Sequence, residues 1–537
     1  MRNDDVFLFF HRFTMRKGFA ILFRMKSLSK PLGAGAGALL LLLANLLSYG
    51  AGLFRDLLLA NRFGASSDTD AFFAAFVLPD FLFSFLALGF ISGALLSVFH
   101  SAEQKSIAFA EEVFRSFLTI ISLFVAIVSL FFFFFAPVLL PLFFREIEPE
   151  QLQRITHLTR ILLLSPFLFS LSNTIGMILL ARKRFFSMAI SPVLYNLGII
   201  GGIFFFSETF GITAAIWGAV IGAFLHLASR AFDFGSLKLS LCPKISFSPD
   251  LLAIFRLGIP RTIGLALFQA TLFVFAILAA KMPEGSLSAW NFARNIQSLP
   301  VSLFGIAFAT AALPFLSGFF AEKKEILFHK RLSKSASHIL FFALPSMVGL
   351  LLVADMVVGV LFEHGSFDTR SRFLVTSVLV GVAVSIPFES LTHLFSRAFL
   401  AQKNTLFPAL GKFLFFVVTV SVAIFDQQSG VAVFGVAFSS GAIAECFFLM
   451  VLFLRKNPSS FLYDFLPSIM RIGALTIFDA LMIISFLRVS ESFPEILRLA
   501  GAIVVGGVFF IGSAFWLRIP EVEDIFLFSR NKENKEE

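Results

Sequence analysis

Long apolar stretches, each about the length of a membrane-crossing helix, recur along the whole 537-residue chain. A helix needs about 20 predominantly apolar residues to cross the hydrocarbon core of a bilayer. Hydrophobic residues make up 58% of the chain and charged residues 14%, which excludes a soluble enzyme, a disordered protein and a coiled coil. The runs are continuous rather than alternating, which excludes a membrane β-barrel. We predict an all-α polytopic membrane protein.

Fourteen stretches meet the length requirement, so we predict fourteen transmembrane helices. Their approximate bounds are residues 34–54, 71–99, 116–137, 158–181, 186–206, 211–229, 253–280, 287–317, 336–362, 373–400, 406–425, 431–454, 465–487 and 494–517.

The distribution of basic residues predicts the orientation, because cytoplasmic loops carry an excess of Lys and Arg. With the N-terminus inside, 31 of the 43 Lys and Arg residues fall in inside segments and 10 in outside segments. We expect both termini to be cytoplasmic. The net charge of +9 then reflects this bias rather than nucleic-acid binding.

Residues 1–33 form a basic segment before the first span. Charged residues interrupt its apolar stretch 6–23, which argues against a signal peptide. Two interpretations remain open. Either the segment lies along the inner membrane surface, or translation begins at Met25.

A recurring separation indicates an internal duplication. Prolines and span ends repeat at separations of 221, 221 and 220 residues. The pairs are Pro79 with Pro300, Pro166 with Pro387, and Ala181 with Ala401. We predict two pseudo-symmetric six-helix lobes with the same orientation, followed by two C-terminal helices. Parallel repeats of this kind place a substrate cavity between the lobes and favour alternating access.

This organisation divides the chain into six parts. They are a cytoplasmic basic N-terminal segment (1–33), an N-lobe (34–229), a cytoplasmic linker (230–252), a C-lobe (253–454), a C-terminal helix pair (465–517) and a cytoplasmic charged tail (518–537).

The eighth span carries a polar stripe. Asn291, Arg294, Asn295 and Ser298 follow the spacing of one helical face. An ionisable group inside the bilayer is costly and needs a partner or a wet cavity. We interpret the stripe, with an uncompensated Arg294, as an anion-facing cavity wall. The alternative is that Arg294 snorkels or pairs with an acid on another helix.

Charged residues also mark the ends of other spans. Arg55 closes the first span and Asp70 opens the second; Arg55 is either a phosphate contact or the ion-pair partner of Asp70 or Asp56. Arg261 and Gln269 share a face of the seventh span. Arg261 is either an interfacial anchor or a ligand contact.

A second polar face lies in the tenth span, where Glu389, His393 and Arg397 are spaced four residues apart. Two interpretations fit this spacing. One is a route for proton or ion coupling; the other, which we favour, is a stripe of side chains that are hydrogen-bonded and ion-paired at i,i+4 spacing along one helix.

Catalytic and metal-binding signatures are missing from the sequence, which contains no Walker A, HExxH or C-x-x-C motif. Cys242 and Cys446 match no metal spacing. We therefore expect a transporter rather than an enzyme, with no catalytic residue, metal or cofactor. Transport then runs on an ion gradient (H⁺ or Na⁺) or on the membrane potential.

Several motifs resemble a known family. They are Gly52-Leu53-Phe54-Arg55-Asp56, Phe63-Gly64-Ala65-Ser66, Thr69-Asp70-Ala71-Phe72-Phe73, Pro260-Arg261-Thr262-Ile263-Gly264 and Asn291-Phe292-Ala293-Arg294-Asn295. Over about residues 34–520 the chain resembles the MurJ (MviN) family of lipid II flippases, within the MOP exporter superfamily.

The resemblance implies fourteen helices, two lobes around a cationic cavity, and a groove for the lipid tail at the last two helices (465–517). It implies cavity roles for Arg55 and Asp70. Other family positions differ: Tyr49 stands where an Arg is expected, and Phe83, Ser84 and Leu88 replace two Arg residues and a Glu. The family's eighth-helix Arg aligns with Asn295, next to Arg294.

We expect a flippase of the bacterial cytoplasmic (inner) membrane that moves lipid II to the outer leaflet for cell wall synthesis. Arg55, Arg294, Arg261, Asn291, Asn295, Gln269 and Asp70 are the candidate substrate-binding residues, with Glu389 and His393 for coupling. Expected partners are lipid II, membrane lipids and cell-wall synthesis enzymes. Rival interpretations are a flippase for another polyprenyl-linked polysaccharide unit, a MATE-like cation-coupled drug exporter, a membrane glycosyltransferase and a non-transporting scaffold.

Overall fold

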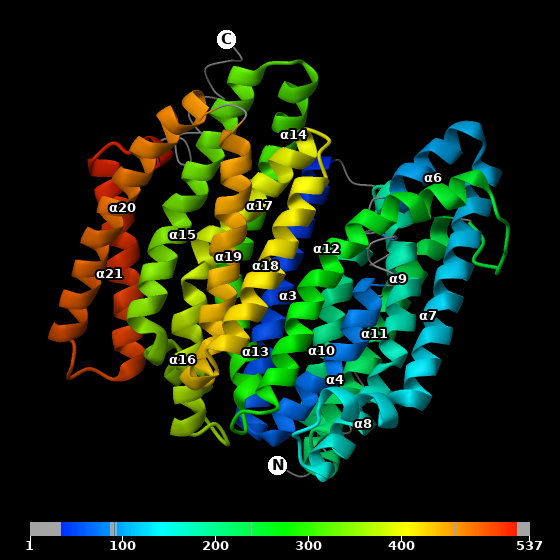
Figure 1. Ribbon diagram of the computed structural model, residues 1–537, viewed down its shortest axis with the longest axis horizontal. Helices are drawn as coiled ribbons and strands as arrows, with labels where there is room; N and C mark the ends of the chain where they lie inside the picture. Colours follow the sequence, from blue (N-terminus) through cyan, green and yellow to red (C-terminus); the bar gives the residue numbers. More distant parts are fainter. Residues whose placement is uncertain (1–33, 86–90, 92–93, 238, 456–457, 523–537) are drawn as a thin grey trace, which may run out of the picture. The chain divides into compact units, whose positions relative to one another are not determined.

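The computed structural model describes residues 34–522 apart from 86–90, 92–93, 238 and 456–457 (Figure 1). Within these residues every regular element is a helix. The helices are α3 (Ala34–Phe63), α4 (Ser67–Phe83), α6 (Ala94–Lys105), α7 (Ile107–Phe143), α8 (Pro149–Leu162), α9 (Leu164–Ala181), α10 (Phe186–Phe210), α11 (Thr213–Phe234), α12 (Pro249–Ala279), α13 (Ser286–Pro300), α14 (Ala307–Ala321), α15 (Glu325–Phe362), α16 (Thr369–Ala383), α17 (Ser385–Ala401), α18 (Leu406–Phe425), α19 (Ala432–Leu454), α20 (Pro458–Val489) and α21 (Glu495–Trp516). The basic segment 1–33 and most of the tail 518–537 lie outside the described residues.

The prediction of an all-α multi-pass membrane protein is confirmed. In the described part of the chain, eleven helical segments are long and apolar enough to cross a membrane, and the bent pair α16–α17 makes a twelfth. The two remaining predicted spans, 34–54 and 71–99, coincide with α3 and with α4 and α6. Fourteen membrane crossings remain a prediction.

Two spans break at equivalent places. The α8–α9 span is interrupted at Leu163 and the α16–α17 pair at Val384, 221 residues later. In each case a proline follows three residues after the break. A proline clashes with the carbonyl four residues before it and removes a backbone donor, which interrupts the helix there. The bend between α16 and α17 is 45°.

The described residues form two compact units. The first contains the described parts of 1–55, 78–139 and 156–262, and the second contains 56–77, 140–155 and the chain from 263 onwards. These units differ from the predicted lobes, because two short segments before residue 230 belong to the second unit. The boundary also falls within α12 rather than in the predicted linker 230–252.

Each unit has its own hydrophobic core. In the first unit, Phe99, Phe114 and Phe117 are fully buried where α6, α7 and α9 meet. In the second, a core of α14, α15, α17, α19, α20 and α21 includes a contact between the rings of Phe341 and Phe510, 4.9 Å apart. That contact packs the C-terminal helix pair against α15.

Close backbone approach packs α10 against α11. A Cβ added to Gly202 would lie 2.3 Å from the carbonyl oxygen of Ala214, and one added to Gly218 would lie 2.6 Å from that of Gly198. Small residues four positions apart allow such contacts between membrane helices. These glycines therefore determine how closely the two helices pack.

Candidate functional site

The polar stripe of the eighth predicted span lies on α13, and Asp70 holds the start of this helix. The Asp70 carboxylate accepts hydrogen bonds from the backbone N–H groups of Gly285 and Ser288, both 2.8 Å, and from the Ser288 hydroxyl at 2.6 Å. The first N–H groups of a helix lack internal partners and favour a negative charge. Asp70, from α4, therefore acts as the N-terminal cap of α13 and positions it.

Three loops meet around this cap, and we call residues 61–70, 284–288 and 363–371 the loop junction. Gly64, Gly285 and Gly365 all have positive φ there, at 67°, 88° and 61°. A Cβ on any of them would come within 2.5 Å of a backbone oxygen of another loop. The backbone N–H of Ser366 also donates to the carbonyl of Asn61 at 2.8 Å. The Phe63-Gly64-Ala65-Ser66 motif is thus explained by close backbone packing.

The third loop of the junction ends in a helix cap. The Asp368 side chain accepts from the backbone N–H and the hydroxyl of Ser371, at 2.8 and 2.7 Å, and caps α16. These hydrogen bonds favour the carboxylate and hold the pKa of Asp368 below its usual value. The Ser371 hydroxyl in turn accepts from the backbone N–H of Ala65 at 3.3 Å.

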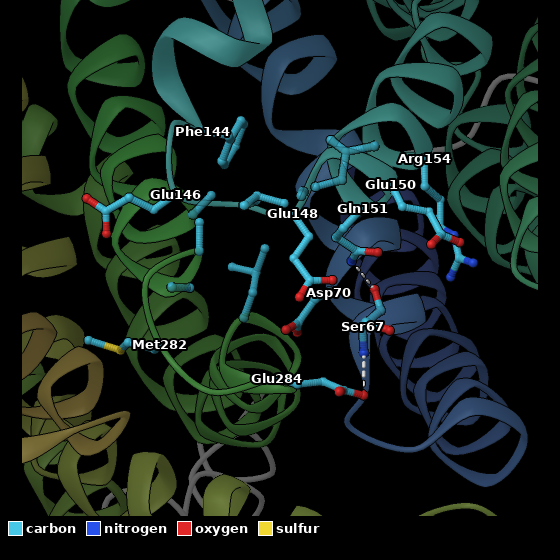
Figure 2. A pocket seen from close by; sticks show the side chains of 17 residues that line it. Ser67, Asp70, Phe144, Glu146, Glu148, Glu150, Gln151, Arg154, Met282 and Glu284 are labelled. Atoms are coloured by element: carbon cyan, nitrogen blue, oxygen red, sulfur yellow. Dashed lines mark hydrogen bonds between the residues drawn. The ribbon is translucent and has the colours of Figure 1, made fainter.

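An acidic cavity of about 430 Å³ lies beside the loop junction, entirely within the second unit (Figure 2). Its ionisable lining residues are Asp70, Glu146, Glu148, Glu150, Arg154 and Glu284. Figure 2 shows Ser67 bonded on one side to Gln151, whose amide donates to its carbonyl at 2.6 Å, and on the other to Glu284, which accepts from its backbone N–H at 3.0 Å. The Gln151 contact holds the segment 140–155 against the start of α4, and the Glu284 contact holds the loop before α13 there.

Further ion pairs surround this cavity. Arg154 pairs with Asp68, and Lys281 pairs with Glu146 at 2.7 Å. Across the described residues, no group of three or more His, Cys, Asp or Glu side chains is placed to hold a metal ion. The carboxylates outnumber the basic groups in this lining. The cavity is therefore a poor site for a pyrophosphate, because its negative charge would be repelled.

Arg294 is paired, so the prediction of an uncompensated arginine is wrong. Its Nη2 lies 2.7 Å from Oε1 of Glu389 on α17, and its Nη1 donates to Gln297. Its guanidinium carbon also lies 4.6 Å from the centre of the Phe438 ring. An arginine in an apolar interior requires such compensation. The stated alternative, pairing with an acid on another helix, is the arrangement observed.

The pair belongs to a larger cluster, which we call the Arg294 network. Gln297 is fully buried and donates to Glu389 at 3.0 Å and to Ser385 at 2.8 Å. Asn295, one residue after Arg294, donates to Asp56 at 2.5 Å. The network therefore links α3, α13, α16–α17 and α19 within the second unit.

Two residues of the polar stripe predicted in the tenth span, Glu389 and Arg397, contact other helices. Glu389 pairs with Arg294, while Arg397 donates to the Thr310 hydroxyl at 2.9 Å and to its own helix at the carbonyl of His393, 3.4 Å away. The hydrogen bond from Arg397 to the His393 carbonyl fits the favoured interpretation of a stripe bonded within one helix, whereas the ion pair of Glu389 is made with another helix. Glu389 thus neutralises Arg294 on α13 rather than a basic residue of its own helix.

A second ion pair was not predicted from the sequence. Lys412 on α18 lies 2.9 Å from Glu445 on α19, whose side chain is 2% exposed. A signal was available, because each is the sole charged residue of its apolar stretch, 406–425 or 431–454. Nor was a role predicted for Arg230 of the first unit, which is buried and donates to Ser191 and Asn173 at 3.0 and 2.8 Å.

The other predicted residues are placed as follows. Arg55 belongs to the first unit and donates to Asn196 at 3.2 Å. Asn291 donates to the carbonyl of Leu287 on its own helix at 2.8 Å. Gln269 lies half-buried on α12, and the side chain of Arg261 on the same helix lies outside the described part of the structure.

Interrupted helices and charge pairs between apolar helices are typical of secondary transporters, and the fold and site together define a multi-pass helical membrane transporter. The family model described as lipid II flippase MurJ matches residues 59–505. The chain therefore belongs to the lipid II flippase MurJ family. Its function is that of a lipid II flippase in peptidoglycan synthesis, a transporter and not an enzyme.

Individual relatives agree with this assignment. The chain is 28% identical over 488 residues to the probable lipid II flippase MurJ of Thermotoga maritima, covering 88% of this chain and 94% of the relative. It is 27% identical over 365 residues to the lipid II flippase MurJ of Thermosipho africanus, covering 66% and 72%.

Solved structures show the same fold. A lipid II flippase MurJ in an inward closed conformation superposes with a TM-score of 0.73 at 25% identity, covering 89% of this chain and 99% of that one. An inward-facing multidrug resistance MATE transporter of the MOP superfamily has a TM-score of 0.63 at 16% identity, covering 79% and 94%. The latter is a likeness of fold. The family match favours the flippase over the drug-exporter, glycosyltransferase and scaffold interpretations.

Proposed function

We propose that the Arg294 network recognises the anionic head group of lipid II during the transport cycle. The observation that carries this proposal is the Arg294–Glu389 pair, 2.7 Å long and held between α13 and α17. A guanidinium binds phosphate oxygens through two parallel hydrogen bonds. An arriving pyrophosphate therefore competes with Glu389 for Arg294.

This competition provides a route for energy coupling. A Glu389 carboxylate displaced from Arg294 needs a proton or another cation, because an unpaired charge inside the membrane is costly. His393 lies one helical turn further along α17. Proton or Na⁺ coupling through Glu389 and His393, assisted by the membrane potential, is the mechanism we propose.

Further head-group contacts are proposed from the sequence positions. Asn291 and Asn295 share the polar face of α13 with Arg294 and offer amide groups to sugar or phosphate. Arg55, Arg261 and Gln269 are the remaining proposed contacts.

The loop junction is the proposed gate on the outer side of the membrane. Segments 56–77 and 140–155 are held in the second unit by Asp70, the junction glycines and Gln151. Opening this side requires the Asp70 hydrogen bonds to break, and each bond to a charged group is worth about 1.5–3 kcal/mol. Asp70 thus acts in gating through the position of α13.

The membrane arrangement is proposed to comprise fourteen crossings with both termini in the cytoplasm of a bacterial inner membrane. The Lys and Arg distribution, 31 inside against 10 outside, supports this orientation. The polyprenyl tail is proposed to lie along α20 and α21, within residues 465–517. Membrane lipids and cell-wall synthesis enzymes are the proposed partners.

The test is replacement of the flippase in growing cells. In bacteria whose sole copy of this chain is under repressible control, depletion should make the undecaprenyl-linked precursor accumulate on the inner leaflet. Wild-type chain and Arg145→Ala, which alters an exposed arginine, should restore export, whereas Arg294→Ala should not. Restoration by Arg294→Ala at wild-type rates would remove the network from the recognition site.

A further inference from the structure

The first unit carries an apolar surface hollow with a cationic end. The hollow has a volume of about 610 Å³ and is bounded by α7, α8, α9 and Trp217 of α11. All of its lining residues belong to the first unit. Arg160 supplies its positive charge, His157 lies beside it in the lining, and the walls include Leu130, Phe133, Leu164 and Phe167.

The cationic group lies at one end of the hollow. Helices α7 and α8 are joined by a short loop and run in opposite directions, so Phe133 in the last third of α7 lies at the level of His157 and Arg160 on α8. Ala126 and Phe167 line the other end. The hollow is therefore charged at one end and apolar towards the interior of the membrane.

Arg160 has few contacts for a cation in a membrane-spanning segment. Its Nε donates to the carbonyl of Phe133 at 2.9 Å, and its guanidinium carbon lies 5.3 Å from the centre of the Phe133 ring. Among the described residues it forms no ion pair. A charged group in this position favours an anionic partner supplied from outside the chain.

A second polar group in the hollow lacks a partner. Ser129 lines the wall, the residue is 7% exposed, and its hydroxyl has no hydrogen-bond partner among the described residues. Buried hydroxyl groups are normally hydrogen-bonded. An ester or phosphate oxygen of a bound lipid would satisfy this donor.

A second apolar hollow adjoins the first at Trp217, which lines both. It has a volume of about 510 Å³, its floor is formed by Gly198, Gly201 and Gly202, and Phe206 is part of its wall. Residues 214–225 of α11 that border it span about 17 Å of helix. Trp217 lies one turn into α11, a position that suits the interfacial preference of tryptophan.

We propose that these two hollows bind an anionic diacyl glycerophospholipid. Its phosphate contacts Arg160 and His157, and its acyl chains occupy the hollows on either side of Trp217. Arg160 selects a head group of net negative charge over a zwitterionic one, because the guanidinium repels the cationic ammonium group of a zwitterionic lipid. In the orientation proposed above, the lipid belongs to the outer leaflet.

The test is native mass spectrometry of the purified full chain with an equimolar mixture of phosphatidylglycerol and phosphatidylcholine. We expect phosphatidylglycerol to be retained about tenfold more than phosphatidylcholine, which corresponds to about 1.4 kcal/mol. Arg160→Gln should abolish this preference, Arg160→Lys should keep much of it, and the exposed-site control Arg145→Gln should keep all of it.

A second variant separates the site from effects on folding. Leu164→Trp fills the first hollow without changing the charge, and it should lower retention of phosphatidylglycerol while leaving the helix content unchanged. If Arg160→Gln fails to fold, this variant decides the outcome. Equal retention of both lipids by the wild-type chain, a preference that survives Arg160→Gln, or undiminished binding to Leu164→Trp would each overturn the proposal.

Discussion

At the scale of single residues, Arg294 and Glu389 show how ionisable groups are accommodated in apolar helices. The two side chains are 18% and 15% exposed, and Gln297 contacts both. Removing one partner of such a pair leaves a charge without compensation, and this costs more than removing both. Stability and transport are therefore expected to respond differently to single and double variants.

Glu389→Gln should destabilise the chain by about 3 kcal/mol, because Arg294 loses its anionic partner. The double variant with Arg294→Gln should recover much of this loss. The midpoint of thermal unfolding in detergent measures both effects. Equal midpoints for the single and double variants would show that an unpaired Arg294 charge is not the cause of the loss.

Asp70→Ala should destabilise the chain by about 1–2 kcal/mol, because the first turn of α13 loses its cap. Precursor export should also decrease, since α13 positions the Arg294 network. The matched control is Asp68→Ala, two residues away, whose ion pair with Arg154 is partly exposed and is worth about 0–1 kcal/mol. Thermal unfolding and precursor export check both variants, and similar losses in the two would contradict the capping role.

At the scale of helices, glycine and proline determine the geometry. Pro166 and Pro387 follow the breaks at Leu163 and Val384 by three residues each. The two breaks lie 221 residues apart, the separation on which the predicted duplication rests, and the duplication itself stays a prediction. Gly202 and Gly218 decide the closeness of α10 and α11 because any side chain there would meet backbone atoms.

Gly202→Ala should destabilise the first unit by about 1–3 kcal/mol, because its Cβ would lie 2.3 Å from the Ala214 oxygen. Gly201→Ala, on the same helix with no atom within 4 Å of the added Cβ, should be neutral or slightly stabilising. Thermal unfolding of the two variants side by side measures the difference. A loss at Gly201 as large as that at Gly202 would show that helix contact is not the cause.

At the scale of the whole molecule, the loop junction holds two segments of the predicted first lobe in the second unit. In the proposed mechanism, alternating access requires these contacts to break and re-form. A covalent link across the junction is therefore expected to stop transport.

In a background with both native cysteines replaced by Ser, the pair Asn61→Cys and Ser366→Cys should form a crosslink, because the backbones of these residues are hydrogen-bonded at 2.8 Å. Precursor export should stop under oxidation and return with a reducing agent. Each single cysteine variant under the same oxidant is the control. Export that continues through the crosslinked chain would show that the junction need not open.

The sequence by itself determined the membrane class, the positions of the helices and the family, because apolar run length, helix-breaking prolines and local motifs act over neighbouring residues. Only the tertiary structure decided the partners of Arg294, Asp70 and Lys412. Their contacts join positions 95, 218 and 33 residues apart. Helical periodicity predicts which face a side chain occupies, but not which distant helix meets that face, since packing of the whole unit determines that choice.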